Sequence, residues 1–278
     1  MKSKINLLVL ASLILFTACE RVAKVDIPQT NPLPVLFSFL SPESENSLVT
    51  ISMSAPIYGS SNSGQFKQIT NAQITISDNN GSSKMMPFDI IKSAYKLDQT
   101  EFPINPGMTY TIEAKFLNYN VKGVTIVPNT LVYFDEIIGE KLPQDPTGGD
   151  RYLIRMKWLD EIGVTNYYRV NLEELYGFNS GDTAYYSIGD KMLNDQGKDG
   201  LVVSDKLETY NFNFGGIKPI YTAYLLNTDI HYYEYHRRRL VYFGDDPFSE
   251  PVQQYSNVKG GLGVVASYRK TKTSVVIK

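Results

Sequence analysis

The chain has 278 residues, of which 20% are charged and 42% are hydrophobic, with 20 Tyr, 13 Phe and one Cys. It is long enough to bury two ordinary cores, and its composition excludes disordered, collagen-like and disulfide-rich proteins. A formal charge of -2 gives no general basic surface, so we expect no nucleic-acid partner, and one cysteine cannot form a four-cysteine zinc site.

Residues 1–18 are predicted to be a signal peptide. Lys2 and Lys4 precede an apolar run from Ile5 to Phe16, which ends at Thr17-Ala18-Cys19. A membrane-spanning helix needs ~20 apolar residues, so this shorter run favours export followed by cleavage.

The sequence Thr17-Ala18-Cys19 resembles a lipobox, the signal at which bacterial lipoproteins are acylated on the cysteine sulfur and cut before it. We therefore predict that Cys19 is the lipid attachment site and that several acyl chains hold the protein on a membrane. The alternative is ordinary secretory cleavage near Ala18. Cleavage before Cys19 removes Lys2 and Lys4 from the 27 basic residues, which leaves 25 basic and 29 acidic residues and a formal charge of -4.

The mature chain is predicted to begin with a lipid-anchored linker, residues 19–34, which is rich in proline and poor in large apolar side chains. Residues 35–128 are predicted to form an immunoglobulin-like antiparallel β-sandwich, because apolar and polar residues alternate there with turn signals between them. The alternating segments are Val49–Met53, Ile74–Ile76 and Tyr110–Phe116, and the turns are Asp78–Gly81 and Pro106-Gly107.

Residues 129–278 are predicted to form a second β-rich domain with one helix near the C-terminus. Thr228-Asp229 can cap a helix over about 229–243 that Gly244 ends, and we expect it to pack across this domain. One side of that helix would carry Ile230, Tyr233, Arg237 and Leu240. The candidate strands are Leu131–Ile138, Tyr152–Trp158, Tyr167–Leu175, Ala184–Ile188, Leu262–Tyr268 and Ser274–Ile277.

Several motifs along the mature chain together match a known family. They are the lipobox, a strand leading to a turn (Asn71–Gly81), a Pro-Gly turn (Pro106–Tyr110), a proline-rich segment (Asp246–Pro251) and a glycine-rich closing segment (Ser256–Val264). The set resembles a Bacteroidetes-type lipoprotein family known as domain of unknown function four-two-four-nine. Its most specific residues are Asn257, Gly260, Gly261 and Gly263.

The resemblance implies an outer-membrane lipoprotein of a Gram-negative cell, on its periplasmic or its surface-exposed face, with a TonB-dependent receptor as partner. It supplies no catalytic residue. We interpret Asn257, Gly260, Gly261 and Gly263 as structural. The glycines are expected to let the backbone turn tightly and pass close to the preceding helix.

Three further motifs resemble ligand or metal sites. His231 and His236 are five residues apart, whereas a zinc-protease pair is four apart on a helix, so no metal site is predicted there. The loop from Asp195 to Asp199 is similar to the start of a calcium loop, but Lys206 stands where a bidentate Glu is needed. A plain surface loop is favoured, with a calcium ion near Asp195 and Asp199 as the alternative.

The third motif is Arg237-Arg238-Arg239, which lies among tyrosines that could stack with an anionic or sugar ligand, namely Tyr232, Tyr233, Tyr235 and Tyr242. A solvated helix face is favoured, because three successive helical residues point in three directions. We predict a non-enzymatic accessory or ligand-binding lipoprotein without cofactor or metal, whose small-molecule or glycan ligand the sequence does not name. The alternative is a surface hydrolase acting on glycan or peptide.

Overall fold

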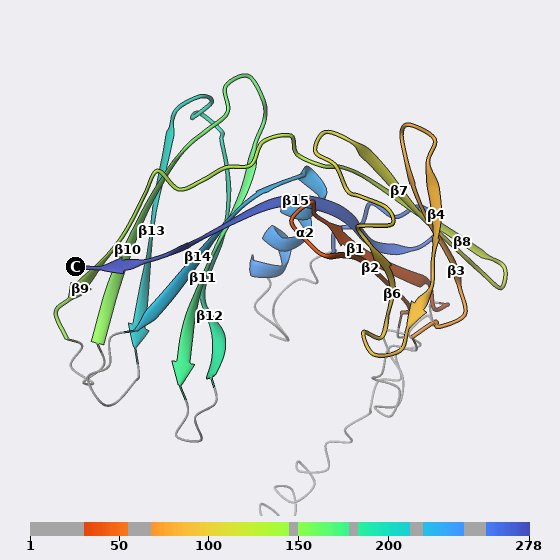
Figure 1. The fold of residues 1–278 in the computed structure, drawn as a ribbon, viewed down its shortest axis with the longest axis horizontal. Helices are drawn as coiled ribbons and strands as arrows, with labels where there is room; N and C mark the ends of the chain where they lie inside the picture. The colour runs from red at the N-terminus through yellow and green to blue at the C-terminus, as the bar shows by residue number, and fades with distance from the viewer. Residues whose placement is uncertain (1–30, 55–67, 145–149, 178–182, 212–218, 242–253) are drawn as a thin grey trace, which may run out of the picture.

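The computed structural model describes residues 31–54, 68–144, 150–177, 183–211, 219–241 and 254–278. Within these ranges the chain is mainly β with one helix near the C-terminus, which confirms the predicted fold class. The strands form two lobes that lie side by side, joined through the middle of the view by one long strand, drawn in blue (Figure 1).

The first lobe is a sandwich of two sheets. One sheet contains β1 (Pro34–Leu40), β2 (Asn46–Met53), β6 (Ala94–Asp98) and β5 (Phe88–Asp89). The facing sheet has the order β4 (Ser83–Met86), β3 (Gln73–Asp78), β7 (Thr109–Phe116) and β8 (Tyr119–Ile126). The inward side chains, including Leu36, Ile51, Ile76 and Ile112, are 0% to 1% exposed, as the alternating pattern requires.

The second lobe also has two facing sheets. One has the order β13 (Val202–Asn211), β10 (Asp150–Leu159), β9 (Glu136–Leu142) and β16 (Val276–Ile277). The other contains β12 (Thr183–Asn194), β11 (Tyr167–Gly177) and β14 (Ile220–Thr228). The core between them is built around fully buried Trp158, Tyr168 and Tyr221.

Strand β15 (Leu262–Ser274) joins the β1-β2-β6-β5 sheet of the first lobe to the β12-β11-β14 sheet of the second. The result is one sheet of eight strands, in the order β12-β11-β14-β15-β1-β2-β6-β5. The first half of β15 pairs in parallel with β1, and its second half pairs antiparallel with β14. Val265 packs in the core of the first lobe and Val275, just after the strand, packs in that of the second. The division at residue 128 stays a prediction, and C-terminal residues contribute to the cores of both lobes.

Helix α2 (Ile230–Val241) lies on one face of this sheet, beneath β15 in Figure 1. We call this the inner face. Asp229 caps the helix, since its Oδ1 accepts a hydrogen bond of 2.7 Å from the Tyr232 amide. The helix packs across both lobes. Tyr232 and Tyr235 contact Phe39 of β1, with ring centroids 5.5 Å and 5.8 Å apart, and Tyr233 contacts Tyr167 of β11, with centroids 4.8 Å apart.

On α2, Tyr232 and Tyr233 are buried, at 4% and 8% exposed, whereas Ile230 and Leu240 are 38% and 42% exposed. The structure corrects one expectation about this region. The glycines of the closing segment approach β1 and β8, as shown below, and not the helix. Gly244 and residues 242–243 lie outside the described residues.

The strand boundaries differ from the predicted ones at several places. The segment predicted as Leu131–Ile138 is strand only from Glu136 onward, because residues 131–135 cross between the lobes. Strand β13 was not predicted. Strand β14 was not predicted either, because Leu225 faces the core and Leu226 faces α2, so both are buried and the alternation of polarity is lost.

Candidate functional site

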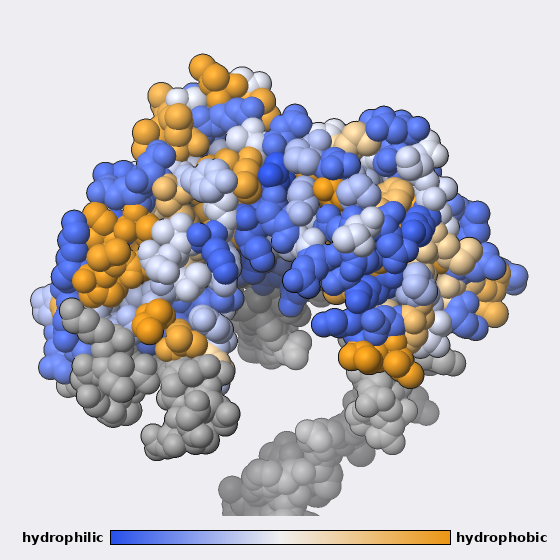
Figure 2. All heavy atoms as spheres, viewed as in Figure 1, coloured by the Kyte–Doolittle hydropathy of each residue, from blue (hydrophilic) through white to orange (hydrophobic). Residues whose placement is uncertain are grey.

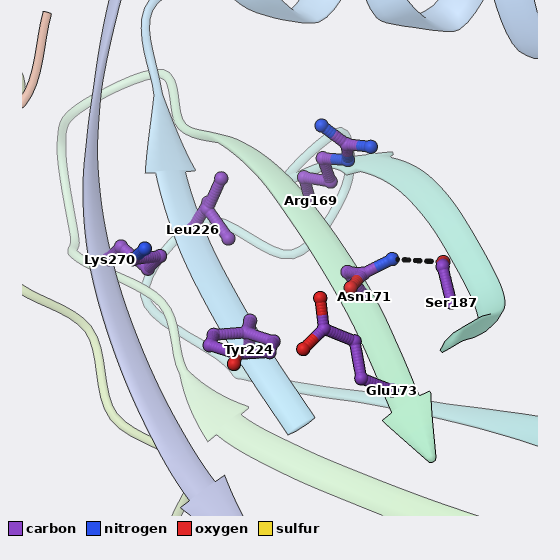
Figure 3. A pocket seen from close by; sticks show the side chains of 7 residues that line it. All are labelled: Arg169, Asn171, Glu173, Ser187, Tyr224, Leu226 and Lys270. Carbon is purple, nitrogen blue, oxygen red and sulfur yellow. Dashed lines mark hydrogen bonds between the residues drawn. The ribbon is translucent and has the colours of Figure 1, made fainter. Parts of the chain in front are cut away.

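A pocket of about 380 Å³ lies on the inner face, over β11, β12, β14 and β15 and next to α2 (Figure 3). We call it the inner-face pocket. Its volume is within the range of small-molecule sites in proteins. The lining side chains are Arg169, Asn171, Glu173, Ser187, Tyr224, Leu226 and Lys270.

Strand β11 supplies a polar row on the floor of the pocket. Its side chains alternate, so Arg169, Asn171 and Glu173 face the pocket while the residues between them face the core. A register shift between Leu172 and Glu173 gives β12 one extra residue there. Asn171 donates hydrogen bonds to Ser187 Oγ at 2.7 Å and to the Gly189 carbonyl oxygen at 3.2 Å, which fixes its amide (Figure 3).

Arg169 is held by three hydrogen bonds. Its Nε and Nη2 donate to the two oxygens of Asp190 at 2.8 Å and 2.5 Å, and its Nη1 donates to the Tyr232 hydroxyl at 2.5 Å. Burial would lower the pKa of Arg169, but Asp190 and Tyr232 hold it above its usual value. The guanidinium therefore carries a fixed positive charge in one orientation.

The neighbouring strands supply an aromatic and apolar row. Register pairs place Tyr224 of β14 beside Asn171 and Leu226 beside Arg169. The ammonium of Lys270 on β15 lies over the Tyr224 ring, 5.6 Å from its centroid. Burial, helped by the nearby Glu173 carboxylate, raises the pKa of Tyr224, so its hydroxyl stays protonated at neutral pH.

The two histidines predicted not to bind metal lie on α2. His231 Nδ1 is 2.6 Å from the Tyr255 hydroxyl, and His236 packs against Phe39 and Tyr232. Burial and the Arg169 charge lower the pKa of His236 to about 4, so it is neutral at pH 7. In the described ranges no three His, Cys, Asp or Glu side chains are grouped so that they could hold a metal ion.

The carboxylates of the calcium-like loop bind backbone amides of the loop that joins β10 to β11. Asp195 Oδ2 accepts a hydrogen bond of 2.7 Å from the Asn166 amide, and Asp199 Oδ1 accepts one of 2.7 Å from the Gly163 amide. These bonds hold together the two loops at the tip of the second lobe. Exposed apolar side chains gather at this tip, at the top of Figure 2: Leu159, Ile162, Val164, Leu201 and Val202.

Asn257 connects the closing segment to two strands. Its Nδ2 donates to the Val124 and Val265 carbonyl oxygens at 3.0 Å and 2.7 Å, and its Oδ1 accepts from the Val265 amide at 3.0 Å. Lys259 continues this contact, because it exchanges two backbone hydrogen bonds with Lys122 of β8.

The glycines after Asn257 run against backbone. A Cβ atom on Gly261 would lie 2.5 Å from the Pro34 carbonyl oxygen. A Cβ atom on Gly263 would overlap the Leu36 carbonyl oxygen. Gly260 and Gly263 also have positive φ values of +79° and +111°. This geometry accounts for all three glycines in structural terms.

Each arginine of the predicted basic run lies over a tyrosine. Arg237 lies over Tyr233 and Arg239 over Tyr235, with distances to the ring centroids of 5.8 Å and 5.6 Å. Arg238 lies over Tyr255 at 5.5 Å. The three guanidinium groups therefore spread around α2 and are not part of the inner-face pocket.

Several sequence-predicted features lie outside the described residues: Cys19, the signal peptide, most of the linker, Tyr242 and Asp246–Pro251. In the described part of the chain, no helix has the length and apolar character needed to cross a bilayer. Sequence reasoning missed every residue of the inner-face pocket. The polar positions of the predicted strand Tyr167–Leu175 were the available signal for three of them.

Comparison with known proteins identifies one family. No curated protein matches the sequence. Residues 20–274 match the family described as "Domain of unknown function (DUF4249)". Because the match covers nearly the whole chain, the protein belongs to this family of unknown function, as the sequence motifs predicted.

Proposed function

We propose that this protein is a non-enzymatic lipoprotein of the bacterial outer membrane that binds a ligand in its inner-face pocket and assists a TonB-dependent transporter. The observation that carries the binding function is the preorganised pocket. Arg169 is fixed by Asp190, and Asn171 by Ser187, through contacts within the chain itself. Preorganised polar groups reduce the entropy lost on binding, which raises affinity.

The membrane part of the proposal is supported by the lipobox at Thr17-Ala18-Cys19, which would place acyl chains on Cys19. The resemblance to TonB-associated lipoproteins supports the choice of partner. The Arg169–Asp190 ion pair supports a binding role, because it holds the guanidinium in one fixed orientation.

The test is affinity purification of the C-terminally tagged protein from detergent-solubilised outer membranes, with Cys19→Ser as the matched control. We expect a TonB-dependent receptor to co-purify with the wild type. Metabolic fatty-acid labelling should mark the wild type and not Cys19→Ser, because the predicted linker offers no second anchor. Absence of any receptor would contradict the partnership, and unchanged labelling of Cys19→Ser would contradict the anchor.

The same preparation tests the alternative. Release of glycan or peptide fragments by the purified protein would support the surface hydrolase and contradict the non-enzymatic function.

A further inference from the structure

The inner-face pocket contains a cation for which the described chain supplies no acidic partner. Arg169 is neutralised by Asp190 at 2.5 Å, whereas no ion pair forms at the Lys270 ammonium within the described residues. Its contact is with the Tyr224 ring, whose negative face attracts a cation weakly. A ligand carboxylate at this position would form a charge-assisted hydrogen bond and supply the missing negative charge.

The floor of the pocket has two different sides. The polar row of Arg169, Asn171 and Glu173 runs along β11, where alternate side chains are about 6.8 Å apart. Tyr224 and Leu226 form an apolar row on β14, about 4.8 Å away. Figure 3 shows the two rows next to each other, with Lys270 beyond the apolar row. A ligand that fits must therefore have a polar edge and an apolar face.

A sugar ring has this character, because its hydroxyl groups lie around the edge while its C–H groups form an apolar face. The Asn171 Oδ1 can accept a hydrogen bond from a ligand hydroxyl, because its Nδ2 already donates to Ser187 and Gly189, and the Glu173 carboxylate is a second acceptor. Aromatic rings offer an apolar surface for C–H groups, and Leu226 extends that surface.

We propose that the inner-face pocket binds a carboxylated saccharide, with the carboxylate at Lys270, a C–H face of the ring on Tyr224 and Leu226, and hydroxyls at Asn171 and Glu173. The proposal rests on the binding function proposed above, and it names the ligand class of that site. The acidic mature chain, with a formal charge of -4, would repel such a ligand elsewhere, so Lys270 also provides the local attraction.

The experiment uses the lipidated protein in detergent and an array of uronic-acid and sialic-acid oligosaccharides. Each oligosaccharide is present both as the free acid and as the methyl ester of its carboxyl group. Isothermal titration calorimetry then measures the dissociation constant for the strongest pair. We expect the acid to bind at least tenfold more tightly than its ester. Lys270→Gln should remove this preference, and Tyr224→Leu should weaken the binding of acid and ester alike.

Lys272→Gln is the matched control, because it removes the same charge two residues further along β15 from a residue that does not line the pocket. We expect its dissociation constant to change less than threefold. Circular dichroism of each variant separates loss of binding from loss of folding.

Three outcomes would overturn the proposal: no binding by any acidic oligosaccharide, equal binding of acid and ester, or equal losses in Lys270→Gln and Lys272→Gln. Tighter binding of a zwitterionic tripeptide than of every saccharide would also overturn the proposal. Glu173 would then bind the ammonium group of the peptide and Lys270 its carboxylate. Receptor co-purification is independent of these measurements. A protein that binds acidic saccharide and recovers no receptor would refute the transporter partnership alone.

Discussion

Thr125 and Asp229 connect the first lobe to the helix through one buried hydrogen bond: Thr125 Oγ1 donates to Asp229 Oδ2 over 2.5 Å. Thr125 is on β8, and Asp229 caps α2, which lies beside the inner-face pocket. Asp229 is 9% exposed, and burial raises its pKa to about 7 despite the hydrogen bonds that it accepts. The protonation state of the Asp229 carboxyl group therefore affects the stability of the contact between α2 and the first lobe.

The first prediction is that Asp229 makes the protein less stable as the pH rises from about 4 to 7. The folded state holds the proton up to about pH 7, whereas the unfolded state releases it near 3.8. The folded state thus binds more protons in this window, and the free energy of unfolding falls with pH. The total change is on the order of a few kcal/mol, because each pKa unit corresponds to about 1.4 kcal/mol.

His236 acts in the opposite direction, since its lowered pKa makes the protein more stable as the pH rises from about 4 to 6.5. The measurement is therefore the difference between wild type and Asp229→Asn in urea unfolding at pH 5 and pH 8. Asparagine keeps the helix cap and has no charge. We expect the stability of the variant relative to wild type to be clearly greater at pH 8 than at pH 5, because the loss caused by Asp229 is only partial at pH 5. An equal difference at both pH values would contradict the prediction.

The second prediction concerns Asn257. Asn257→Asp replaces an amide that donates to the Val124 and Val265 carbonyl oxygens with an acceptor that repels them. We expect a loss of about 2 kcal/mol in the free energy of unfolding, because two hydrogen bonds are lost and carbonyl groups are left unpaired. Asn118→Asp, in the exposed turn between β7 and β8, adds the same charge as a control and should change stability by less than about 0.5 kcal/mol. Equal losses in the two variants would mean that added charge, and not Asn257, is responsible.

The third prediction is that the calcium-like loop is structural. Asp199 already accepts a hydrogen bond from the Gly163 amide, and calcium needs about six to eight oxygens. We expect the melting temperature to be the same in millimolar calcium and in excess chelator. Asp199→Ala should lower stability by about 1 kcal/mol under both conditions, because it removes that hydrogen bond. Tight calcium binding in calorimetry that disappears in Asp199→Ala would refute this.

Local sequence pattern predicted the local structure well and the site poorly. The alternation that predicted Tyr167–Leu175 as a strand also defines which of its side chains face away from the core, including Arg169 and Asn171. The pocket forms only because Tyr224 and Lys270 are brought beside them by pairing of β11 with β14 and of β14 with β15. Such register depends on contacts far apart in sequence, which periodicity does not encode.

The role of β15 in joining the two lobes was not predicted, for a related reason. Its sequence predicted a strand over Leu262–Tyr268. Its parallel partner β1 lies more than 200 residues earlier, so no turn between the two strands marks their pairing in the sequence. The glycines of the closing segment were predicted as structural without their neighbours being known. They lie against β1 and β8 because β15 enters the first lobe at that point.

The last prediction follows from that position. Gly263→Ala should destabilise the protein by on the order of 3 kcal/mol or more, because its φ of +111° is strained for alanine and the new Cβ would overlap the Leu36 carbonyl oxygen. Gly81→Ala is the control, since Gly81 has a similar φ of +91° with no atom within 4 Å of the added Cβ. It should lose only the strain, about 1 to 2 kcal/mol.

Limited proteolysis then distinguishes the region affected. Because Gly263 packs on β1, we expect Gly263→Ala to expose new cleavage sites in the first lobe as well as at the C-terminus. If the first lobe stays as resistant as in wild type while the C-terminal residues are cut, β15 is not needed to hold the two lobes together. If Gly263→Ala and Gly81→Ala lose equal stability in urea unfolding, close packing against Leu36 is not the cause. The expected larger loss in Gly263→Ala would show that the closing segment stabilises the first lobe through backbone contact with β1.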